Sequence, residues 1–458
     1  MNARLHPHDR RGSVLIVAML ITAMLALVLG SYFNLTLTSS KQTRRTFDRN
    51  AAFHLTEAGV EEAVWAYNRS LVGAPDAWSE WTTDGAAAWR KFSDFSLTTG
   101  STGTVKVFAS DTTPSASSRP VIVAEAAVQT GSAAPATQMI EVTLRRRSFF
   151  GNGITALRKL VFRGTQTSFD SWDSDPDHDP ATPPMDYTPA IRSDLGGVAT
   201  GATDSANLYA KHAKIYGFLT TAGALPDVDS GLIGPLGTEP GIIASARVAT
   251  DFNAVFPTIP SPTDGTWVSP LPATLGVAGE TTRWRTDTLT LSGSKTLTIL
   301  GHVTLIITAP ADTTAISITG QASLIIPKGS SLAVYFEGDI RVSGSGNANS
   351  LVNGNVQPAS FILWGTHSTE AGQTIDITGR GELRAVIYAP KGDFTLTGDA
   401  TMFGAVIARD IVFAGNATFH YDLSLGRLID HAPYGPQSWR LITSQPERRL
   451  LAPLFTDR

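Results

Sequence analysis

The segment GELRAVIYAPKGDFTLTGDATMFGAVIARDIVFAGNATFHYDLSL, residues 381–425, carries the strongest structural signal in this sequence. It contains the short unit apolar-x-apolar-x-Gly twice, at Phe394–Gly398 and at Ile411–Gly415. Alternating apolar and polar residues are typical of a half-buried β-strand, and a glycine at the end of such a run marks a sharp turn. An apolar residue returns four positions after each of these glycines, so we expect a second short strand beyond the corner.

The same unit recurs along the C-terminal two thirds of the chain. Its seven copies begin at Leu160, Leu289, Ile316, Ile340, Ile375, Phe394 and Ile411, and the returning apolar residues include Leu297, Leu324, Leu383, Met402 and Phe419. The last five copies start 24, 35, 19 and 17 residues apart, which is the range expected for single coils of a β-solenoid with occasional loop insertions. Few Asn-Gly or Asp-Gly pairs occur, so the tight hairpins of an antiparallel sandwich are not favoured.

These repeats predict a right-handed parallel β-helix over residues 149–425, in which apolar side chains of successive coils stack about 4.8 Å apart. Residues 226–287 contain many prolines and glycines, as in FPTIPSPTDGTWVSPLP, and are expected to form an insertion that interrupts the coils. Residues 426–458 are expected to form a C-terminal tail.

The N-terminal part of the chain predicts a helix that begins inside a membrane. Val14–Phe33 is an almost unbroken apolar run of about 20 residues, the length that crosses a bilayer as a helix. Residues 1–12 hold three arginines and one acid, so the positive-inside rule places this leader in the cytoplasm and the rest of the chain outside. Three basic residues between positions 41 and 45 follow the span and weaken this asymmetry.

Helical periodicity continues beyond the apolar run, and we assign residues 13–71 to one transmembrane and stalk helix. Apolar and small residues recur every three to four positions: Phe47, Ala51, Leu55, Ala58, Gly59, Ala63 and Ala66. A helix from Ser13 to Asn68 would be about 84 Å long, and its amphipathic outer half needs a partner surface. Between residues 72 and 148, three strand-like runs separated by turn residues predict a small antiparallel sheet.

Two stretches of this helix, RRGSVLIVAMLITAML (Arg10–Leu25) and FDRNAAFHLTEAGVEEAVWAYN (Phe47–Asn68), resemble the PilX N-terminal family of type IV pilus assembly proteins. The resemblance implies that a prepilin peptidase removes the leader between Gly12 and Ser13, and that the mature helix packs against other pilins. Two positions depart from the usual pilin pattern, because Ser13 replaces an aromatic residue and Val17 stands where a glutamate is expected. An uncleaved signal anchor is the alternative.

Three motifs of the C-terminal region resemble the core of uncharacterised β-helical domains that are attached to PilX-like N-termini. They are VIYAP at Val386–Pro390, GAVIA at Gly404–Ala408 and HYD at His420–Asp422. This resemblance implies a β-helical fold and no assigned activity. We assign His420 to the closing coil and not to a catalytic site.

Acidic residues supply the candidate ligands. The sequence SWDSDPDHDP places four carboxylates at alternate positions, Asp173, Asp175, Asp177 and Asp179, a spacing that could turn their oxygens toward a calcium ion. A solvated acidic loop is the alternative. Three further aspartates each stand directly before a strand of the repeat: Asp339, Asp393 and Asp410. They could stack and bind calcium or polysaccharide, but aspartate is also an ordinary turn former.

Composition and motifs limit the function. A net charge of −4 with 17% charged residues argues against a nucleic-acid partner, and the lack of cysteine excludes disulfides and thiolate metal sites. We find no nucleophile elbow, phosphate-binding loop or paired metal-ligand histidines, so we predict that the protein is not an enzyme and has no cofactor other than that calcium ion.

The sequence therefore predicts a minor pilin-like protein of the bacterial inner membrane. Its head would lie in the periplasm or on the cell surface, in a pilus-like fibre, and would make structural or adhesive contacts with a polysaccharide or protein ligand. The alternative is a surface-tethered, carbohydrate-active β-helix enzyme, which clustered Asp, Arg and Lys on adjacent coils would favour.

Overall fold

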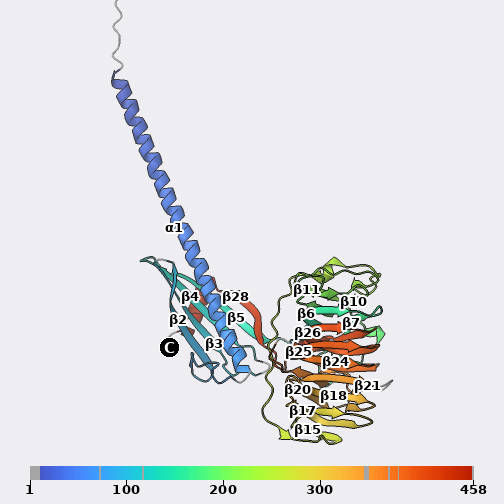
Figure 1. Cartoon of the computed structure of the whole chain (residues 1–458). Coiled ribbons are helices and arrows are strands. Elements are labelled where there is room, and N and C mark those ends of the chain that lie inside the picture. The colour runs from blue at the N-terminus through green and yellow to red at the C-terminus, as the bar shows by residue number, and fades with distance from the viewer. Residues whose placement is uncertain are drawn as a thin grey trace, which may run out of the picture. The chain divides into compact units, whose positions relative to one another are not determined.

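The computed structural model describes residues 11–71, 74–98, 100–115, 118–344, 350–369, 372–379 and 381–455. The chain forms two compact units, one of residues 1–146 together with 433–458, and the other of residues 147–432. The second unit is therefore inserted into the sequence of the first. As predicted, the chain is mainly β, with a long N-terminal helix, a small antiparallel sheet and a large parallel sheet (Figure 1).

The first unit combines helix α1 (Arg11–Leu71) with a six-stranded antiparallel sheet of order β1-β2-β3-β4-β5-β28 (Figure 1). The sheet strands are β1 (Thr82–Thr83), β2 (Ala87–Thr98), β3 (Ser101–Ser110), β4 (Val121–Thr130), β5 (Ala136–Arg146) and β28 (Tyr434–Leu441). A short helix α2 (Gln445–Leu451) and a 3-10 turn η5 (Ala452–Phe455) follow β28. Strands β3, β4 and β5 contain the three runs that the sequence predicted.

The C-terminal segment contains a strand of the first unit's sheet and is not only a tail. The sequence predicted a tail over residues 426–458, but β28 pairs antiparallel with β5, from Tyr434 opposite Arg146 to Leu441 opposite Ile140. Its sequence, YGPQSWRL, is broken by glycine and proline and has no apolar alternation. Tertiary pairing with the edge of β5 therefore specifies this strand, and local propensity does not.

The C-terminal half of α1 packs on one face of the sheet through small residues. Ala52, Ala63 and Ala66 are completely buried, and a Cβ added at Gly59 would lie 2.7 Å from Val105 Cγ1. The helix can approach the strands this closely because no bulky side chain separates them. The predicted contact face is right at Gly59, Ala63 and Ala66, but it is wrong at Phe47 and Ala58, which are exposed.

The opposite face of this sheet is also covered. Strand β4 alternates its side chains, so that Ile122 and Ala124 join the core under α1 while Val123 points to the other face. There the C-terminal segment closes a small second core, made of Val123, Met139 and Ile442 with Leu451, Leu454 and Phe455 packed against them. The last residues of the chain are thus part of the first unit's core.

The second unit is a stack of parallel coils (Figure 1). Coil by coil, from one end of the stack to the other, its strands are β14 (Thr266–Trp267), β15 (Thr274–Thr286), β16 (Leu289–Leu291), β17 (Thr296–Ile307), β18 (Thr314–Gly320), β19 (Ser323–Ile326), β20 (Ser331–Phe336), β21 (Asp339–Gly344), β22 (Leu351–Asn353), β23 (Phe361–Gly365), β24 (Thr374–Thr378), β25 (Gly381–Thr397), β26 (Ala400–Phe413), β27 (Thr418–Asp422), β6 (Ile154–Phe162), β7 (Ser168–Trp172), β8 (Gly197–Thr200), β9 (Leu208–Tyr209), β10 (Lys214–Tyr216), β11 (Phe218–Thr221), β12 (Leu232–Gly234) and β13 (Val248–Ala249). Four 3-10 turns lie between them: η1 (Pro189–Ile191), η2 (Ser245–Arg247), η3 (Pro358–Ser360) and η4 (Leu423–Arg427).

The repeated unit forms a continuous inward ladder, which confirms the parallel arrangement. Its first residues pair in register in the order Leu289, Ile316, Ile340, Ile375, Phe394, Ile411 and Leu160. All seven side chains are buried. Each coil therefore buries its apolar residues against the equivalent residues of its neighbours, as in other solenoids.

The glycines that end the unit form a column of their own. A Cβ at Gly164 would lie 2.0 Å from the Gly415 carbonyl oxygen, and one at Gly415 would lie 2.2 Å from that of Gly398. Any side chain would collide with the backbone of the adjacent coil. Coil stacking therefore requires glycine at Gly164, Gly398 and Gly415, whereas a Cβ at Gly293 or Gly379 would meet nothing within 4 Å.

The coils do not stack in the order of the sequence. The last coil (β26 and β27) pairs in parallel with the first (β6 and β7), at Ile411 opposite Leu160 and Phe419 opposite Phe169. The chain thus enters the stack in its middle, coils to one end, crosses to the far end and coils back to its own starting point. The start and end of the inserted unit consequently lie together, and Ser148 Oγ donates to the Leu425 carbonyl at 2.7 Å.

A single extended strap makes the crossing from one end of the stack to the other. Ten successive strand pairings connect Val248 at one end of the stack to Thr266 at the other. At about 4.8 Å between paired strands, the two ends are about 48 Å apart. Residues 250–265 contain no helix or strand, and the 17 residue steps from Ala249 to Thr266 reach about 56 Å when extended. The strap is therefore just long enough for a nearly straight path.

Contacts along the strap follow the order of the coils. Phe252 N donates to the Thr221 carbonyl near one end, Tyr388 Oη donates to the Pro257 carbonyl at 2.6 Å in the middle, and Asp264 pairs with Arg283 at the far end. The insertion predicted over residues 226–287 is therefore too broad. Strands β12 to β15 within that range belong to coils, and only the strap between them lacks regular structure.

We expect Leu396→Asp to destabilise the second unit by several kcal/mol, because it would place a charge inside a ladder where Leu396 is 1% exposed. The matched control is Thr397→Asp, one residue away on the partly exposed side of the same strand, which should cost less than about 1 kcal/mol. Urea unfolding monitored by circular dichroism measures both. Equal losses for the two variants would contradict the inward assignment.

Candidate membrane-spanning helix and assembly surface

The N-terminal half of α1 presents apolar side chains that nothing in the first unit covers. Every side chain from Val14 to Phe47 is exposed, and the large apolar ones up to Leu37 are 53–72% exposed. In the described part of the chain, α1 is the one helix that is long and apolar enough to cross a membrane. A surface of this size is unfavourable in water, so it requires either a bilayer or other apolar helices around it.

The two threonines within this apolar half satisfy their own hydroxyl hydrogen bonds. Thr22 Oγ1 donates to the Ala18 carbonyl at 2.7 Å, and Thr36 Oγ1 donates to the Tyr32 carbonyl at 2.9 Å. Hydroxyl groups bonded back to the preceding turn need no water. They are therefore compatible with a hydrocarbon environment, where an unpaired donor would be costly.

The predicted cleavage position lies at the beginning of α1. The backbone is helical at Gly12 and Ser13, while residues 1–10 of the leader lie outside the described residues. Val17, which replaces the glutamate expected from the family resemblance, is 53% exposed on the helix. Nothing in this geometry tests whether the leader is cleaved, so cleavage stays a prediction.

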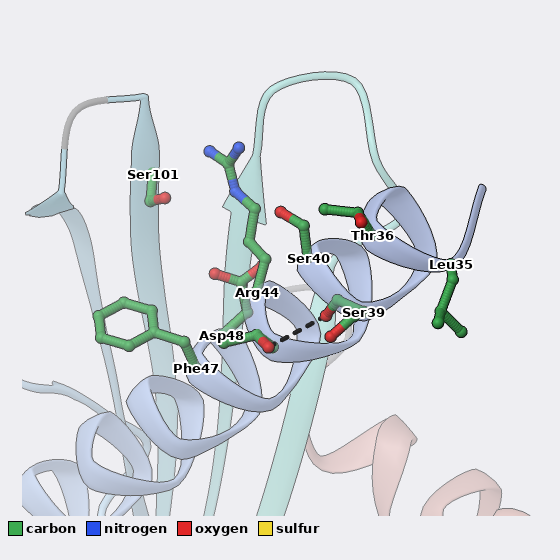
Figure 2. Close-up of a pocket in the computed structure, with 9 residues that line it drawn as sticks. Leu35, Thr36, Ser39, Ser40, Arg44, Phe47, Asp48 and Ser101 are labelled. Atoms are coloured by element: carbon green, nitrogen blue, oxygen red, sulfur yellow. Dashed lines mark hydrogen bonds between the residues drawn. The ribbon is translucent and has the colours of Figure 1, made fainter. Parts of the chain in front are cut away.

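A chain of buried polar groups fixes the point where α1 leaves the sheet. Asp48 is 8% exposed and accepts a hydrogen bond from Thr130 Oγ1 at 3.0 Å, and Thr130 in turn lies 3.0 Å from Ser101 Oγ. Figure 2 shows the shallow pocket at this level, with Phe47 and Ser101 beside it and the Arg44 side chain extended from the helix. Breaking buried hydrogen bonds costs free energy, so the bonds that link Asp48, Thr130 and Ser101 hold the helix at one height on the sheet.

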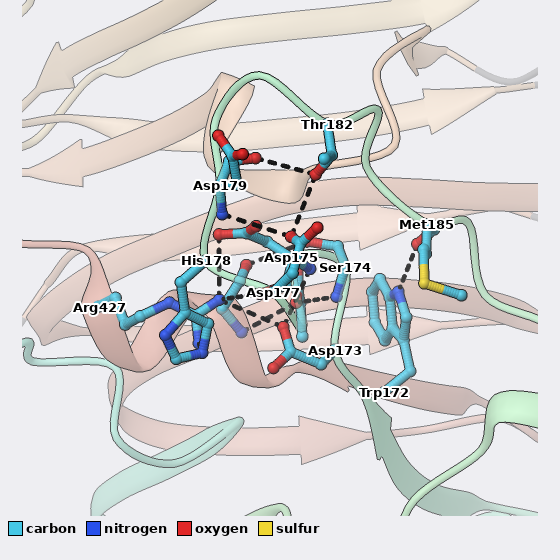
Figure 3. A network of polar contacts seen from close by, with 12 residues as sticks. Trp172, Asp173, Ser174, Asp175, Asp177, His178, Asp179, Thr182, Met185 and Arg427 are labelled. Carbon is cyan, nitrogen blue, oxygen red and sulfur yellow. Dashed lines mark hydrogen bonds and ion pairs between the residues drawn. The ribbon is translucent and has the colours of Figure 1, made fainter.

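The predicted acidic loop is organised by Arg427 and by its own backbone (Figure 3). Arg427 Nη2 lies 3.3 Å from Asp173 Oδ1 and 3.2 Å from Asp175 Oδ2, and Asp177 Oδ1 accepts the Asp179 amide at 3.3 Å. Within the described residues, no group of three or more His, Cys, Asp or Glu side chains could hold a metal ion. The carboxylates of this loop thus have partners within the protein, and calcium binding stays a prediction.

The aspartates that precede strands of the repeat join neighbouring coils. Asp393 and Asp410 are in register one coil apart, and each accepts two hydrogen bonds from an arginine: Arg409 Nε lies 2.8 Å from Asp393 Oδ1, and Arg158 Nε lies 2.8 Å from Asp410 Oδ1. Asp339 instead accepts a backbone amide of the next coil at 2.8 Å. These carboxylates therefore have structural partners, in line with the turn role.

A buried acid–histidine pair, which no sequence pattern indicated, joins the first and last coils. Asp170 and His420 are opposite each other in paired strands, and His420 Nδ1 lies 2.5 Å from Asp170 Oδ1. Tyr187 Oη donates to Asp170 Oδ2 at 3.0 Å, and burial together with that carboxylate raises the pKa of Tyr187. Among the described residues no hydroxyl nucleophile bonds to His420, so the pair lacks the third member of a catalytic triad.

Asp422 is a second buried acid at this junction. Its Oδ1 accepts the amides of Ser174 and Ser424 at 3.1 and 3.0 Å, while Oδ2 is buried without a partner among the described residues. Burial raises the pKa of this carboxyl group, because the charged form loses its hydration.

Comparisons with known proteins concern mainly the solenoid. Residues 274–428 match the family described as Domain of unknown function (DUF7305), and this range covers the run of coils from β15 to η4. No curated protein matches the chain. The structure of the competence-associated pilin ComZ from Thermus thermophilus aligns over 86% of this chain and 98% of that chain, with 11% identity and a TM-score of 0.23. At that TM-score the likeness carries no argument about fold or function.

We expect Asp422→Asn to stabilise the protein by about 1 kcal/mol at pH 7 and to have little effect at pH 4. The raised pKa means that the folded state holds the proton more tightly than the unfolded state, so this group's contribution is most favourable at low pH and declines as pH rises through the folded pKa. Urea unfolding at both pH values measures this difference. Asp399→Asn, at an exposed aspartate, is the control, and a variant effect independent of pH would contradict the argument.

Proposed function

We propose that this chain is a membrane-anchored minor subunit of a type IV pilus or a related bacterial assembly, with its solenoid displayed for structural or adhesive contact. The observation that carries the proposal is the division of α1. One uninterrupted helix exposes an apolar half from Val14 to Leu37 and buries its other half against a small antiparallel sheet. An inner-membrane anchor that later packs among other pilin helices needs this combination.

The environment of the exposed half supports helical partners. Its apolar side chains are exposed all around the helix, which is the pattern of a helix that is surrounded by lipid or by a bundle. The resemblance of Arg10–Leu25 to the PilX N-terminal family adds that these partners are other pilins and that a prepilin peptidase processes the leader. The head would then face the periplasm or the cell surface, where a polysaccharide or protein could bind it.

A surface-tethered, carbohydrate-active enzyme is the second candidate function. The observation in its favour is the cluster of charged residues on adjacent coils, Arg158, Asp393, Arg409 and Asp410. Each carboxylate of this cluster is engaged by an arginine, so neither is free to act as the acid or base of glycoside cleavage. We therefore propose a head without enzymatic activity.

Cleavage of the leader tests the first proposal. We expect the mature protein from membranes to begin at Ser13, and Gly12→Val to leave Met1 in place, because a β-branched side chain would block the peptidase at the cut. Mass spectrometry of the N-terminal peptide reads both. Gly30→Val is the control within the same helix, since a Cβ there meets nothing within 4 Å, and an intact Met1 in the unaltered protein would refute processing.

We further expect few copies, located at the tip of the fibre or in its initiating complex. A coil stack about 48 Å long is difficult to place beside identical heads at the close spacing of packed helices, and at a tip this crowding disappears. The missing glutamate at Val17 fits a first subunit, which has no earlier neighbour to pair with. Immunogold labelling of the head should decorate fibre ends, and regular labelling along the shaft would exclude the tip position.

A further inference from the structure

A basic groove lies where α1 leaves the sheet of the first unit. It has a volume of about 790 Å³ and combines three segments that are distant in sequence: residues 41–49 of α1, residues 130–138 around the turn between β4 and β5, and residues 441–448 around the start of α2. Five cations line it, against one carboxylate: Lys41, Arg44, Arg45, Arg49 and Arg448, and Asp48. The Asp48 carboxylate is buried and bonded to Thr130, so the groove presents a strongly positive surface.

These cations have no acidic counter-ion in the part of the chain that the structure describes. Among the described residues, neither the four on α1 nor Arg448 forms an ion pair. Arg448 is nevertheless held in place, because its Nε donates to the Ile442 carbonyl and its Nη1 donates to Thr137 Oγ1, both at 2.9 Å. A guanidinium group positioned by neutral acceptors is prepared to bind an external anion.

The height of the groove along α1 indicates which anion it meets. The apolar residues from Val14 to Leu37 span about 35 Å of helix, which fills the hydrocarbon core of a bilayer. Lys41 then lies about 6 Å beyond Leu37, and Arg44 and Arg45 lie about 10–12 Å beyond it. This is the level of the lipid headgroups, which long basic side chains can reach by extending toward them.

We infer that this groove binds the phosphate of an anionic phospholipid headgroup at the outer face of the membrane. The inference rests on the proposed membrane anchoring of α1. Guanidinium groups form paired hydrogen bonds with phosphate oxygens, and clustered basic residues next to a membrane span attract anionic lipids. The turn beside the groove, with Ala133, Ala134 and Pro135, carries no acid that would repel the headgroup. Lipid binding in the groove holds the sheet of the first unit against the membrane surface.

The full-length protein in neutral detergent micelles allows a direct test by isothermal titration calorimetry. We expect saturable binding of dihexanoylphosphatidylglycerol, with at least tenfold weaker binding of dihexanoylphosphatidylcholine and of inorganic phosphate. The double variant R44Q/R45Q should weaken phosphatidylglycerol binding at least tenfold. Both side chains are exposed, so the variant should keep its fold.

The matched control is K91Q/K106Q, which removes two exposed cations of the same unit outside the groove and should leave binding unchanged. Equal affinity for the two lipids, equal loss in the control variant, or phosphate binding as tight as lipid binding would each overturn the inference. Membrane extraction with carbonate separates this result from the proposed function. R44Q/R45Q should remain in the membrane fraction, whereas loss of the unaltered chain from that fraction would refute the anchor itself.

Discussion

The parallel pairing of the last solenoid coil with the first is the constraint on which the whole arrangement depends. Strand β5 ends at Arg146 and its neighbour β28 begins at Tyr434, and these two residues lie opposite each other in the antiparallel sheet. Any unit inserted between them must therefore return its chain to the point where it entered. The pairing of β26 with β6 achieves this, because the stack closes on its own first coil.

This closure determines the rest of the second unit. A solenoid that begins in its middle must cross its own length once, and the strap of residues 250–265 has the length for one nearly straight crossing. The junction of the two ends is also where buried polar groups gather, including the Asp170–His420 pair and Asp422. Hydrogen bonds at this junction specify how the first and last coils meet, at some cost in desolvation.

The surfaces suited to a membrane are in the first unit. In the second unit, Arg158 pairs with Asp410 and Arg409 pairs with Asp393. In the first unit, the apolar half of α1 is uncovered, and the five cations of the groove have no ion-pair partner among the described residues. Apolar and basic surfaces in this order along one helix match the core and headgroup layers of a membrane. The anchoring chemistry is thus concentrated within the first 50 residues and the segments that pack beside them.

The sequence alone determined the features that arise from local patterns. Length and hydropathy predicted the apolar half of α1, and the repeat with its glycine predicted the coils and their inward residues, because side-chain periodicity follows directly from strand and helix geometry. Only the tertiary structure decided what depends on distant partners. The stacking of Ile411 on Leu160, the strand at Tyr434–Leu441 and the groove built from residues 41–49, 130–138 and 441–448 join segments that share no local signal. Such contacts are specified by packing across the completed fold, which no window of sequence contains.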